Sequence, residues 1–457
     1  MRVERERGFD FTQDLLAPGR WTVRGRGRAE FHVRCAFDPP PGPDIQAARR
    51  AELQRRADLV RRLGDPSDAR LRVLASAADA FIVCRRAGGT DLATVIAGYP
   101  WFGDWGRDAM IALPGLAIET GRLDVAGKVL AAFAEAASDG MIPNCFAEET
   151  GRPLYNTVDA SLWFLQAVAA CGRAGDEGQA LCETLWPVAR EIVERYAAGT
   201  RFAVHADADG LIAAGSHDTQ LTWMDARTSD GRPVTPRYGK AVEIQALWLS
   251  GLALVEEMAA DLGQAPPAAC AMRAKARDAF EALFWNAEAA CLFDCAFPDG
   301  LRDPAVRPNQ VFAVGLPHAP LRGRRAEAVV RAVRKKLLTP RGLRTLAPND
   351  PSYQGMYEGG PDERDAAYHQ GTVWPWLLGP YVDAVFAAEP RRCARGEAAQ
   401  VLAGLLDATE EAGLGQISEV YDGDPPHRPG GCIAQAWSVA AAVHVWRRLE
   451  ATGGVPR

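Results

Sequence analysis

Helix-forming segments fill most of this sequence, and the connections between them alternate between short and long. Apolar residues recur at helical spacing along each segment. The segments lie near 46–64, 67–84, 106–120, 122–138, 157–173, 178–199, 241–262, 266–286, 306–314, 322–337, 365–387, 391–410 and 431–449. The long connections, rich in Gly, Pro, Trp and Asp, lie near 85–105, 139–156, 200–240, 287–305, 338–364 and 411–430. If successive helices run up and down, every long connection falls at the same end of the molecule.

This alternation predicts an all-α fold, an (α/α)6 toroid of helical hairpins, with its functional site at the long-loop end. An open α-solenoid is the alternative, but it would need repeats of similar sequence, which the chain lacks. Residues 1–45 differ, because Phe31, Val33 and Cys35 alternate with polar residues as in a strand, and a proline-rich linker follows. We therefore expect strands or the remnant of an N-terminal β region in 1–45, and the catalytic toroid in 46–457.

The net charge and the cysteines of the chain indicate which binding partners and which cellular compartment to expect. The 457 residues carry a net charge of −6, which gives no electrostatic reason to expect a nucleic acid or an anionic membrane as partner. The N-terminus lacks the apolar core of a secretory signal, and no apolar run reaches the ~18 residues of a membrane span. The ten cysteines are scattered, and Cys291 and Cys295 have no second ligand pair nearby. We expect reduced thiols, no metal site and a cytoplasmic protein.

Each long connection, or the helix start after it, is rich in aromatic, carboxylate and amide side chains. The substrate-binding candidates are Trp101, Asp104, Trp105, Arg107, Asp108, Asn156, Asp159, Trp223, Lys240, Glu243, Tyr368, His369, Gln370, Trp374 and Tyr421. Flat aromatic rings beside hydrogen-bonding groups suit a sugar, which is apolar on its faces and hydroxylated at its rim. Taken singly, a tryptophan is more often a core residue and an aspartate before a helix is often an N-cap. Their occurrence together at one end favours a carbohydrate site.

Glycoside hydrolysis needs two carboxyl groups that flank the scissile bond. Asp225 follows Trp223 and Met224, an apolar setting that would keep it protonated. Glu419 lies in a glycine-rich loop that could hold a water molecule against it. On residue context alone the pair stays open, with rival acids Asp104, Asp108, Asp159, Glu243, Glu358 and Asp365.

The chain resembles the amylo-α-1,6-glucosidase domain of bacterial and archaeal glycogen-debranching enzymes over roughly 68–450. The matching motifs, in family order, are GYPWFGDWGRDAMIALPGL, GMIPNCF with YNTVDASLW, LTWMDA with VTPRYGKAVEIQALW, RPNQVFA, YHQGTVWPWLLGPY and ISEVYDGDPPHRPGGCIAQAWSVA. The resemblance implies an (α/α)6 barrel that releases glucose from α-1,6 stubs of limit dextrins with inversion. It makes Asp225 the general acid and Glu419 the general base. It implies that Arg107 and Asp108 hold hydroxyls of the terminal glucose.

No cofactor is needed for this chemistry. Family members usually carry a sizeable β domain before the barrel, and here at most its last strands remain. The sequence therefore does not identify which glucan is the natural substrate. A transferase or the β domain could come from outside this chain. The alternatives are a glucoamylase- or trehalase-like α-glucosidase of the same architecture, and a catalytically silent glucan-binding module.

Overall fold

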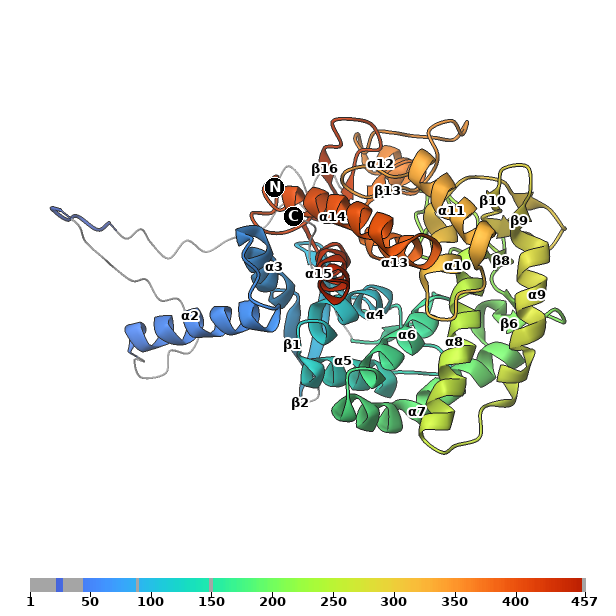
Figure 1. The fold of residues 1–457 in the computed structure, drawn as a ribbon, viewed down its shortest axis with the longest axis horizontal. Coiled ribbons are helices and arrows are strands. Elements are labelled where there is room, and N and C mark those ends of the chain that lie inside the picture. Colours follow the sequence, from blue (N-terminus) through green and yellow to red (C-terminus); the bar gives the residue numbers. More distant parts are fainter. Residues whose placement is uncertain (1–21, 28–43, 88–89, 148–150, 454–457) are drawn as a thin grey trace.

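The computed structural model describes residues 22–27, 44–87, 90–147 and 151–453 and is built mainly of helices. Figure 1 shows most of them arranged about a central axis, with α2 extending away from the rest. The α-helices are α2 (Ile45–Arg62), α3 (Ala69–Asp79), α4 (Gly106–Leu113), α5 (Leu123–Glu135), α6 (Ala160–Gly172), α7 (Asp176–Ala198), α8 (Val242–Asp261), α9 (Arg273–Phe284), α10 (Phe312–Gly315), α11 (Gly323–Lys336), α12 (Pro361–Tyr368), α13 (Leu378–Ala388), α14 (Arg391–Ala408) and α15 (Ala436–Ala451). Short 3₁₀ or π segments adjoin some of them: η1 (Pro114–Ile118), η2 (Arg201–Ala203), η3 (Ala268–Met272), η4 (Pro308–Val311) and η5 (Pro375–Leu377).

The helices form two concentric layers. In the inner layer, α4, α6, α8, α10, α13 and α15 contact one another in chain order, and α15 returns to contact α4. Around them, α3, α5, α7, α9, α11 and α14 each pack against an inner helix. This closed order gives a glycosidase-like helical toroid, since in an open solenoid the first and last inner helices would lie apart.

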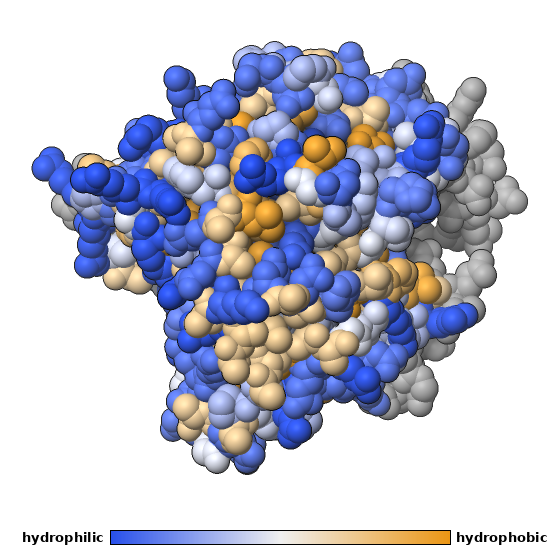
Figure 2. All heavy atoms as spheres, turned by 90° about the vertical axis from the view of Figure 1, so that its right-hand side faces the viewer, coloured by the Kyte–Doolittle hydropathy of each residue, from blue (hydrophilic) through white to orange (hydrophobic). Residues whose placement is uncertain are grey.

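The composition of each helix matches its layer. The inner helix α6 (ASLWFLQAVAACG) is buried over nearly its whole surface, because its sequence is apolar on every face. The outer helix α11 buries only Ala326, Val329, Val330 and Val333, a single stripe at helical spacing, and turns its arginines and lysines outward. Figure 2 shows the face over α9, where hydrophilic residues surround a hydrophobic area. The apolar periodicity of each helix thus indicates whether it lies in the core or at the surface.

Short strands connect the long loops to one another at the N-terminal ends of the inner helices. The strands are β1 (Ile82–Ala87), β2 (Thr90–Tyr99), β3 (Phe102–Asp104), β4 (Cys145–Phe146), β5 (Pro153–Leu154), β6 (His205–Ala206), β7 (Ile212–Ala213), β8 (Lys240–Ala241), β9 (Trp285–Asn286), β10 (Cys291–Leu292), β11 (Cys295–Ala296), β12 (Arg302–Asp303), β13 (Leu343–Arg344), β14 (Val373–Trp374), β15 (Val420–Tyr421), β16 (Pro429–Gly430) and β17 (Ala434–Gln435). Antiparallel pairing joins β8 to β11, β14 to β15, and β17 to β2.

Backbone contacts complete this circle of loops. An isolated bridge joins Trp105 to Cys145. The Val158 N–H donates to the Leu221 carbonyl at 2.8 Å, and the Ala347 N–H donates to the Val306 carbonyl at 3.1 Å. Each long loop is therefore bonded to the next around the ring, which confirms the prediction that the long loops gather at one end.

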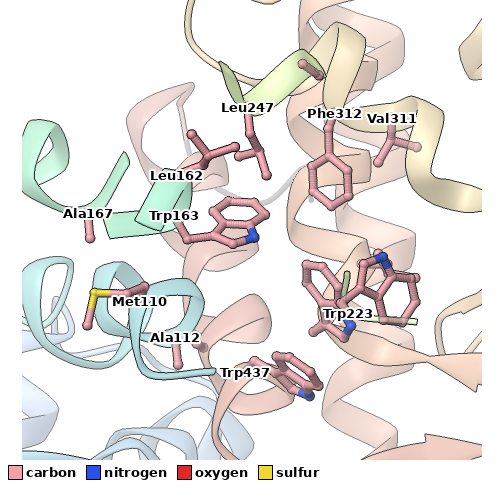
Figure 3. Packing of buried hydrophobic residues seen from close by; sticks show 14 of the residues in the cluster. Met110, Ala112, Leu162, Trp163, Ala167, Trp223, Leu247, Val311, Phe312 and Trp437 are labelled. Atoms are coloured by element: carbon pink, nitrogen blue, oxygen red, sulfur yellow. The ribbon is translucent and has the colours of Figure 1, made fainter. Parts of the chain in front are cut away.

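Aromatic side chains fill the centre of the ring beneath the loops. Trp376 stacks on Trp437 with ring centroids 5.1 Å apart, and Trp163 meets both Trp376 and Phe312 edge-on. Figure 3 shows Trp163, Phe312 and Trp437 converging from α6, α10 and α15, together with Trp223 from the loop before α8. Trp163 is therefore a core residue, as its helical spacing indicates.

The structure corrects several expected boundaries. The segment near 67–84 ends as a helix at Asp79, and β1 and β2 form an antiparallel hairpin where a helix end and an irregular loop were expected. The single helix expected near 365–387 is divided into α12 and α13. Gly371 at φ 150° and Pro375, which lacks a backbone N–H, cannot continue an α-helix there. The strands expected between Trp21 and Asp38 lie outside the described residues, apart from 22–27, which contain no strand.

Candidate active site

A pocket of about 740 Å³, including its open mouth, lies at the long-loop end of the toroid. Its lining comes from the loops and from the first turns of inner helices. The lining residues are Phe102, Trp105, Arg107, Asp108, Trp223, Asp225, Tyr357, Asp365, Tyr368, Trp374, Glu419, Gln435 and Trp437. Aromatic rings form much of the wall, and the ionisable groups comprise four carboxyl side chains beside the single guanidinium of Arg107. The pocket therefore suits a neutral, hydroxylated ligand better than an anion.

Arg107 is buried in one wall of the pocket, where it binds two carboxyl groups. It lies in the first turn of α4, and its side chain is 3% exposed. Its Nε donates to Asp159 Oδ1 at 2.7 Å, and its Nη1 donates to Asp225 Oδ2 at 2.8 Å. Asp159 precedes α6, so the ion pairs connect two inner helices and the loop that carries Asp225. The guanidinium is thereby held rigidly between the carboxyl groups of Asp159 and Asp225.

Asp225 reaches the pocket from the long loop before α8. Its side chain is 30% exposed, and burial raises its pKa although the Arg107 guanidinium opposes that shift. Because Oδ2 already accepts from Arg107, the proton of the neutral form belongs on Oδ1. Nε2 of His369 lies 4.0 Å from Oδ1. Asp225 can therefore serve as a proton donor.

Glu419 occupies another wall and is held as an acceptor. Its Oε1 accepts a hydrogen bond from the Tyr368 hydroxyl, and its Oε2 accepts one from the Cys432 N–H at 2.8 Å. Donors on both oxygens favour the ionised carboxylate. Gly431 makes the approach possible, because it adopts φ 64° and a Cβ there would lie 2.2 Å from Oε2. Glu419 is thus equipped to accept a proton.

Asp108 adds a further carboxyl between these groups. Burial raises its pKa to about 8, and the negative charges of Asp225 and Glu419 act in the same direction. Arg107 opposes the shift. At neutral pH Asp108 can therefore carry a proton and donate it in a hydrogen bond to a ligand oxygen.

His369 lies directly behind the pocket wall. It is completely buried and stacks on Trp374 with centroids 5.2 Å apart. Burial lowers its pKa well below the ordinary value, with nearby arginines adding to the effect. The imidazole is consequently neutral, and its 4.0 Å approach to Asp225 is not an ion pair.

The pocket brings together only part of the set proposed from sequence. Besides Asp225 and Glu419, the predicted residues that line it are Trp105, Arg107, Asp108, Trp223, Tyr368 and Trp374. Asp159 and His369 lie one layer behind, against Arg107 and Asp225 respectively. Trp101, Asp104, Asn156, Lys240, Glu243, Gln370 and Tyr421 do not line the pocket.

Most of these outlying residues have other partners within the protein, and their proposed role in binding stays a prediction. Lys240 pairs with Asp207 and Asp209 at 2.8 and 2.7 Å. Asp104 faces Arg85 at 3.3 Å. Asn156 is exposed, and Trp101 is half-buried in the turn between β2 and β3. Three residues lie in the interior: Glu243 pairs with Arg237, Gln370 accepts a hydrogen bond from Arg307, and Tyr421 is buried in β15.

Other lining residues were not among the site residues proposed from sequence: Phe102, Tyr357, Asp365, Gln435 and Trp437. Phe102 and Asp365 belong to segments already singled out for their composition. Tyr357 stacks on Tyr368 with centroids 5.6 Å apart, a pairing between loop and helix that sequence spacing does not reveal. The helical position of Trp437 predicts a core residue, and the side chain is indeed buried. It also lines the pocket.

None of the helices in the described ranges is long and apolar enough to cross a bilayer. Across these same ranges, no group of three or more His, Cys, Asp and Glu side chains is arranged to hold a metal ion. Every cysteine that the structure describes is a free thiol.

Comparison with known proteins identifies a matching family model and a related glycogen debranching enzyme. The family model of amylo-alpha-1,6-glucosidase matches residues 76–444. A glycogen debranching enzyme of Saccharomyces cerevisiae is 28% identical over 405 residues, which are 66% of this chain and 26% of the yeast protein. This chain therefore matches about a quarter of that relative's length.

Solved structures share the fold at low sequence identity. A GH63 mannosylglycerate hydrolase from Thermus thermophilus, in complex with Tris, superposes with a TM-score of 0.61 at 15% identity. The match covers 82% of this chain and 99% of that one. An uncharacterized conserved protein from the same organism gives a TM-score of 0.57 at 15% identity, covering 77% of this chain and 95% of its own.

Proposed function

The chain belongs to the amylo-alpha-1,6-glucosidase family, and we propose that it releases glucose from α-1,6 branch points of an α-glucan with inversion at C1. The observation that carries this proposal is the contrast between two carboxyl groups in one pocket. Burial raises the pKa of Asp225, whereas both oxygens of Glu419 accept hydrogen bonds, from the Tyr368 hydroxyl and the Cys432 N–H. One acid and one base are what an inverting glycosidase requires.

In the proposed mechanism a single displacement occurs at C1. Asp225 gives its Oδ1 proton to the glycosidic oxygen as the C1–O bond breaks and its electron pair passes to that oxygen. Glu419 removes a proton from a water whose oxygen forms the new C1–O bond on the opposite face. The products are β-glucose and a glucan with a free 6-hydroxyl, and both carboxyls return to their starting states by exchange with solvent.

The other pocket residues suit a terminal glucose. Asp108, with its raised pKa, and Arg107 offer hydrogen bonds to sugar hydroxyls. Trp105 and Trp374 present aromatic surface to the apolar faces of the ring.

We further propose that the toroid is an (α/α)6 barrel, on the strength of its alternating inner and outer helices. The free thiols favour a cytoplasmic location. Because this chain matches about a quarter of the yeast glycogen debranching enzyme, we also propose that a transferase outside this chain shortens the branches first.

The fold relative suggests a second candidate, hydrolysis of a small anionic α-glycoside such as mannosylglycerate. A glycerate carboxylate would have to enter a pocket with four carboxyl side chains, in which Arg107 already pairs with Asp159 and Asp225. The charge of the pocket therefore favours the neutral glucan.

Release of the terminal sugar from a set of substrates tests the proposal, measured as glucose from the glucosides and as mannose from mannosylglycerate. Panose or a branched limit dextrin should be cleaved fastest, and maltose, trehalose and mannosylglycerate should be cleaved slowly or not at all. Preferential cleavage of maltose, trehalose or mannosylglycerate would contradict the proposed specificity for α-1,6-linked glucose. Binding of branched dextrin without glucose release would indicate a non-catalytic module.

A further inference from the structure

The segment that carries Asp225 is anchored through successive side chains. The hydroxyl of Thr222 accepts from Arg237 Nη1 at 3.1 Å. The indole Nε1 of Trp223 donates to Asn309 Oδ1 at 2.8 Å. Met224 Sδ accepts from Asn309 Nδ2 at 3.5 Å. One amide side chain therefore holds the two residues directly before the proposed acid.

Asn309 is fixed in a single orientation by its neighbours. Its Nδ2 also donates to Asp294 Oδ1 at 2.7 Å, while its Oδ1 faces the N–H of Trp223. Because the carboxylate can only accept and the indole can only donate, exchanging the amide oxygen and nitrogen would break both bonds. Asn309 is completely buried at the start of η4, so no solvent replaces a lost partner.

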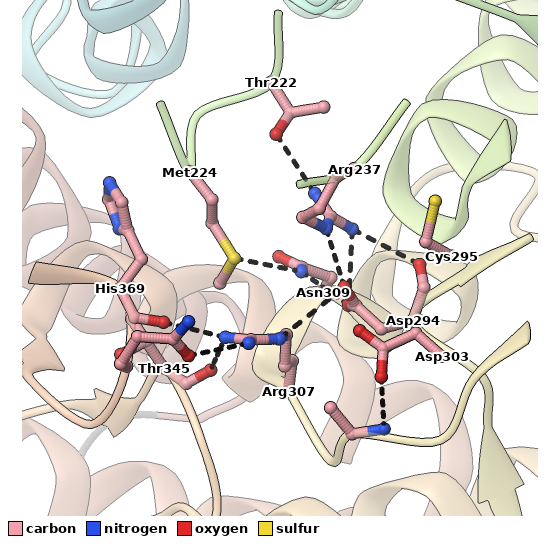
Figure 4. A network of polar contacts seen from close by, with 12 residues as sticks. Thr222, Met224, Arg237, Asp294, Cys295, Asp303, Arg307, Asn309, Thr345 and His369 are labelled. Carbon is pink, nitrogen blue, oxygen red and sulfur yellow. Dashed lines mark hydrogen bonds and ion pairs between the residues drawn. The ribbon is translucent and has the colours of Figure 1, made fainter. Parts of the chain in front are cut away.

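Asp294 anchors Asn309 to a buried ionic cluster. Its carboxylate accepts from Arg237 Nε at 2.6 Å and lies 3.8 Å from Arg307 Nε. Arg237 also pairs with Glu243, which completes a balance of charges in the interior. Figure 4 shows the contacts converging on Asn309 and Asp294 from the segments that hold Met224, Arg237 and Arg307. Asn309, Asp294, Arg237, Glu243 and Arg307 are not among the residues that line the pocket.

We propose that Asn309, backed by Asp294, is a positioning residue that sets the proton-donating geometry of Asp225. This inference rests on the proposed function, because it takes Asp225 as the general acid. With Trp223 and Met224 fixed, Asp225 meets Arg107 through Oδ2 and keeps Oδ1 for the glycosidic oxygen. If Trp223 and Met224 shift, Asp225 no longer binds Arg107 through Oδ2 while directing Oδ1 to the glycosidic oxygen. Proton transfer then slows while the rest of the pocket stays in place.

The test variant is Asn309→Asp, which keeps the shape and the acceptor for Trp223 but places a carboxylate against Asp294. The matched control is Gln245→Glu, an equally buried amide-to-acid change on α8, whose side chain bonds to the backbone of Ile212. Both variants are assayed on panose and on α-glucosyl fluoride, whose fluoride leaves without a proton donor. Urea unfolding is measured in parallel to show that each variant is folded.

For Asn309→Asp we expect kcat on panose to fall about 10–100-fold, with KM changed less than about 3-fold, since misplacing a catalytic group slows chemistry more than binding. Turnover of α-glucosyl fluoride should fall far less. The alkaline limb of the panose pH profile should move to higher pH, because the ion pair with Arg107, which lowers the pKa of Asp225, is weakened. Gln245→Glu should leave the ratio of the two activities unchanged.

A reciprocal swap provides the rescue. Asp294→Asn combined with Asn309→Asp exchanges amide and carboxylate, restores one N–H···O bond between them and keeps the net charge, so panose turnover should recover in part. Equal losses on panose and fluoride, or no recovery in the swap, would overturn the positioning role. Asp225→Asn with normal panose turnover would instead overturn the proposed function, which keeps the two failures separate.

Discussion

Asp225 and Glu419 are the same kind of functional group placed in opposite surroundings. Asp225 is partly buried beside one cation, so burial and ion pairing oppose each other and burial prevails. Glu419 is more deeply buried, but hydrogen-bond donors contact both of its oxygens. A hydroxyl and a backbone N–H lower the cost of the buried negative charge. The division between acid and base therefore follows from local donors, not from residue type.

Asp225→Asn tests the acid role. The amide cannot protonate a glucan leaving group, so kcat on panose should fall about 10²–10⁴-fold. Turnover of α-glucosyl fluoride should survive, because fluoride needs no proton. Steady-state rates on the two substrates are compared, and equal losses on both would contradict the assignment of Asp225 as acid.

Glu419→Gln should give the complementary pattern. Without the base no water is activated, so both panose and α-glucosyl fluoride should lose about 10²–10⁴-fold in kcat. Tyr368→Phe, which removes one donor to Glu419, should lower both activities by a smaller factor of about 10. Fluoride turnover that persists in Glu419→Gln would exclude it as the base.

The pH profile of panose hydrolysis provides an independent check. Because burial raises the pKa of Asp225, the protonated acid persists above its ordinary value of 3.8 and is lost as the pH rises through the raised pKa. The alkaline limb of kcat should therefore report Asp225. It should disappear from the residual activity of Asp225→Asn on α-glucosyl fluoride, and its retention there would assign that limb to another group.

At the scale of elements, a charged histidine joins inner helices at the end of the ring away from the long loops. His444 on α15 lies 2.6 Å from Glu119 at the end of η1 and 2.8 Å from Asp383 on α13. The two carboxylates raise its pKa well above the ordinary value despite the cost of burial. Because α15 is the last inner helix and η1 continues the first, this contact closes the ring.

His444→Gln should lower the free energy of unfolding by about 2–3 kcal/mol, less than for a fully buried pair because the group is partly exposed. A raised pKa stabilises the fold fully below the ordinary value of 6.5, and that stability is lost as the pH rises through the raised pKa. The difference between parent and variant in urea unfolding should shrink accordingly. His318→Gln, on the surface pair with Glu257, should change stability by less than about 1 kcal/mol. If the difference in free energy of unfolding between the parent and His444→Gln did not change with pH, His444 would not be the charged partner of Glu119 and Asp383.

Apolar periodicity was enough to predict the layered helices, because burial on one face or all faces leaves a direct pattern in sequence. The hairpin β1–β2 was missed although its pairing is local, with Ile82 opposite Val95, whereas the pairing of β2 with β17 joins residues far apart in the chain, such as Tyr99 and Ala434. In the site, Asp225 and Glu419 required the family resemblance to separate them from rival acids. Lys240 shows the limit of composition, because it pairs with Asp207 and Asp209 and does not line the pocket.

At the scale of the whole molecule, ring closure explains how distant motifs form one pocket. Arg107 on α4 and Glu419 before α15 are far apart in sequence but lie at adjacent inner helices, since α15 contacts α4. Backbone bonding between consecutive loops then fixes the mouth of the pocket. The architecture thus delivers an acid and a base to one cavity from separate segments.

The stereochemistry of the first glucose released tests this arrangement most directly. Proton NMR during early turnover of panose or a branched limit dextrin distinguishes the anomers before mutarotation mixes them. The account predicts that β-glucose appears first, as single displacement by water requires. Initial release of α-glucose would indicate a covalent intermediate and a retaining mechanism, and would contradict the assignment of Glu419 as a base that activates water.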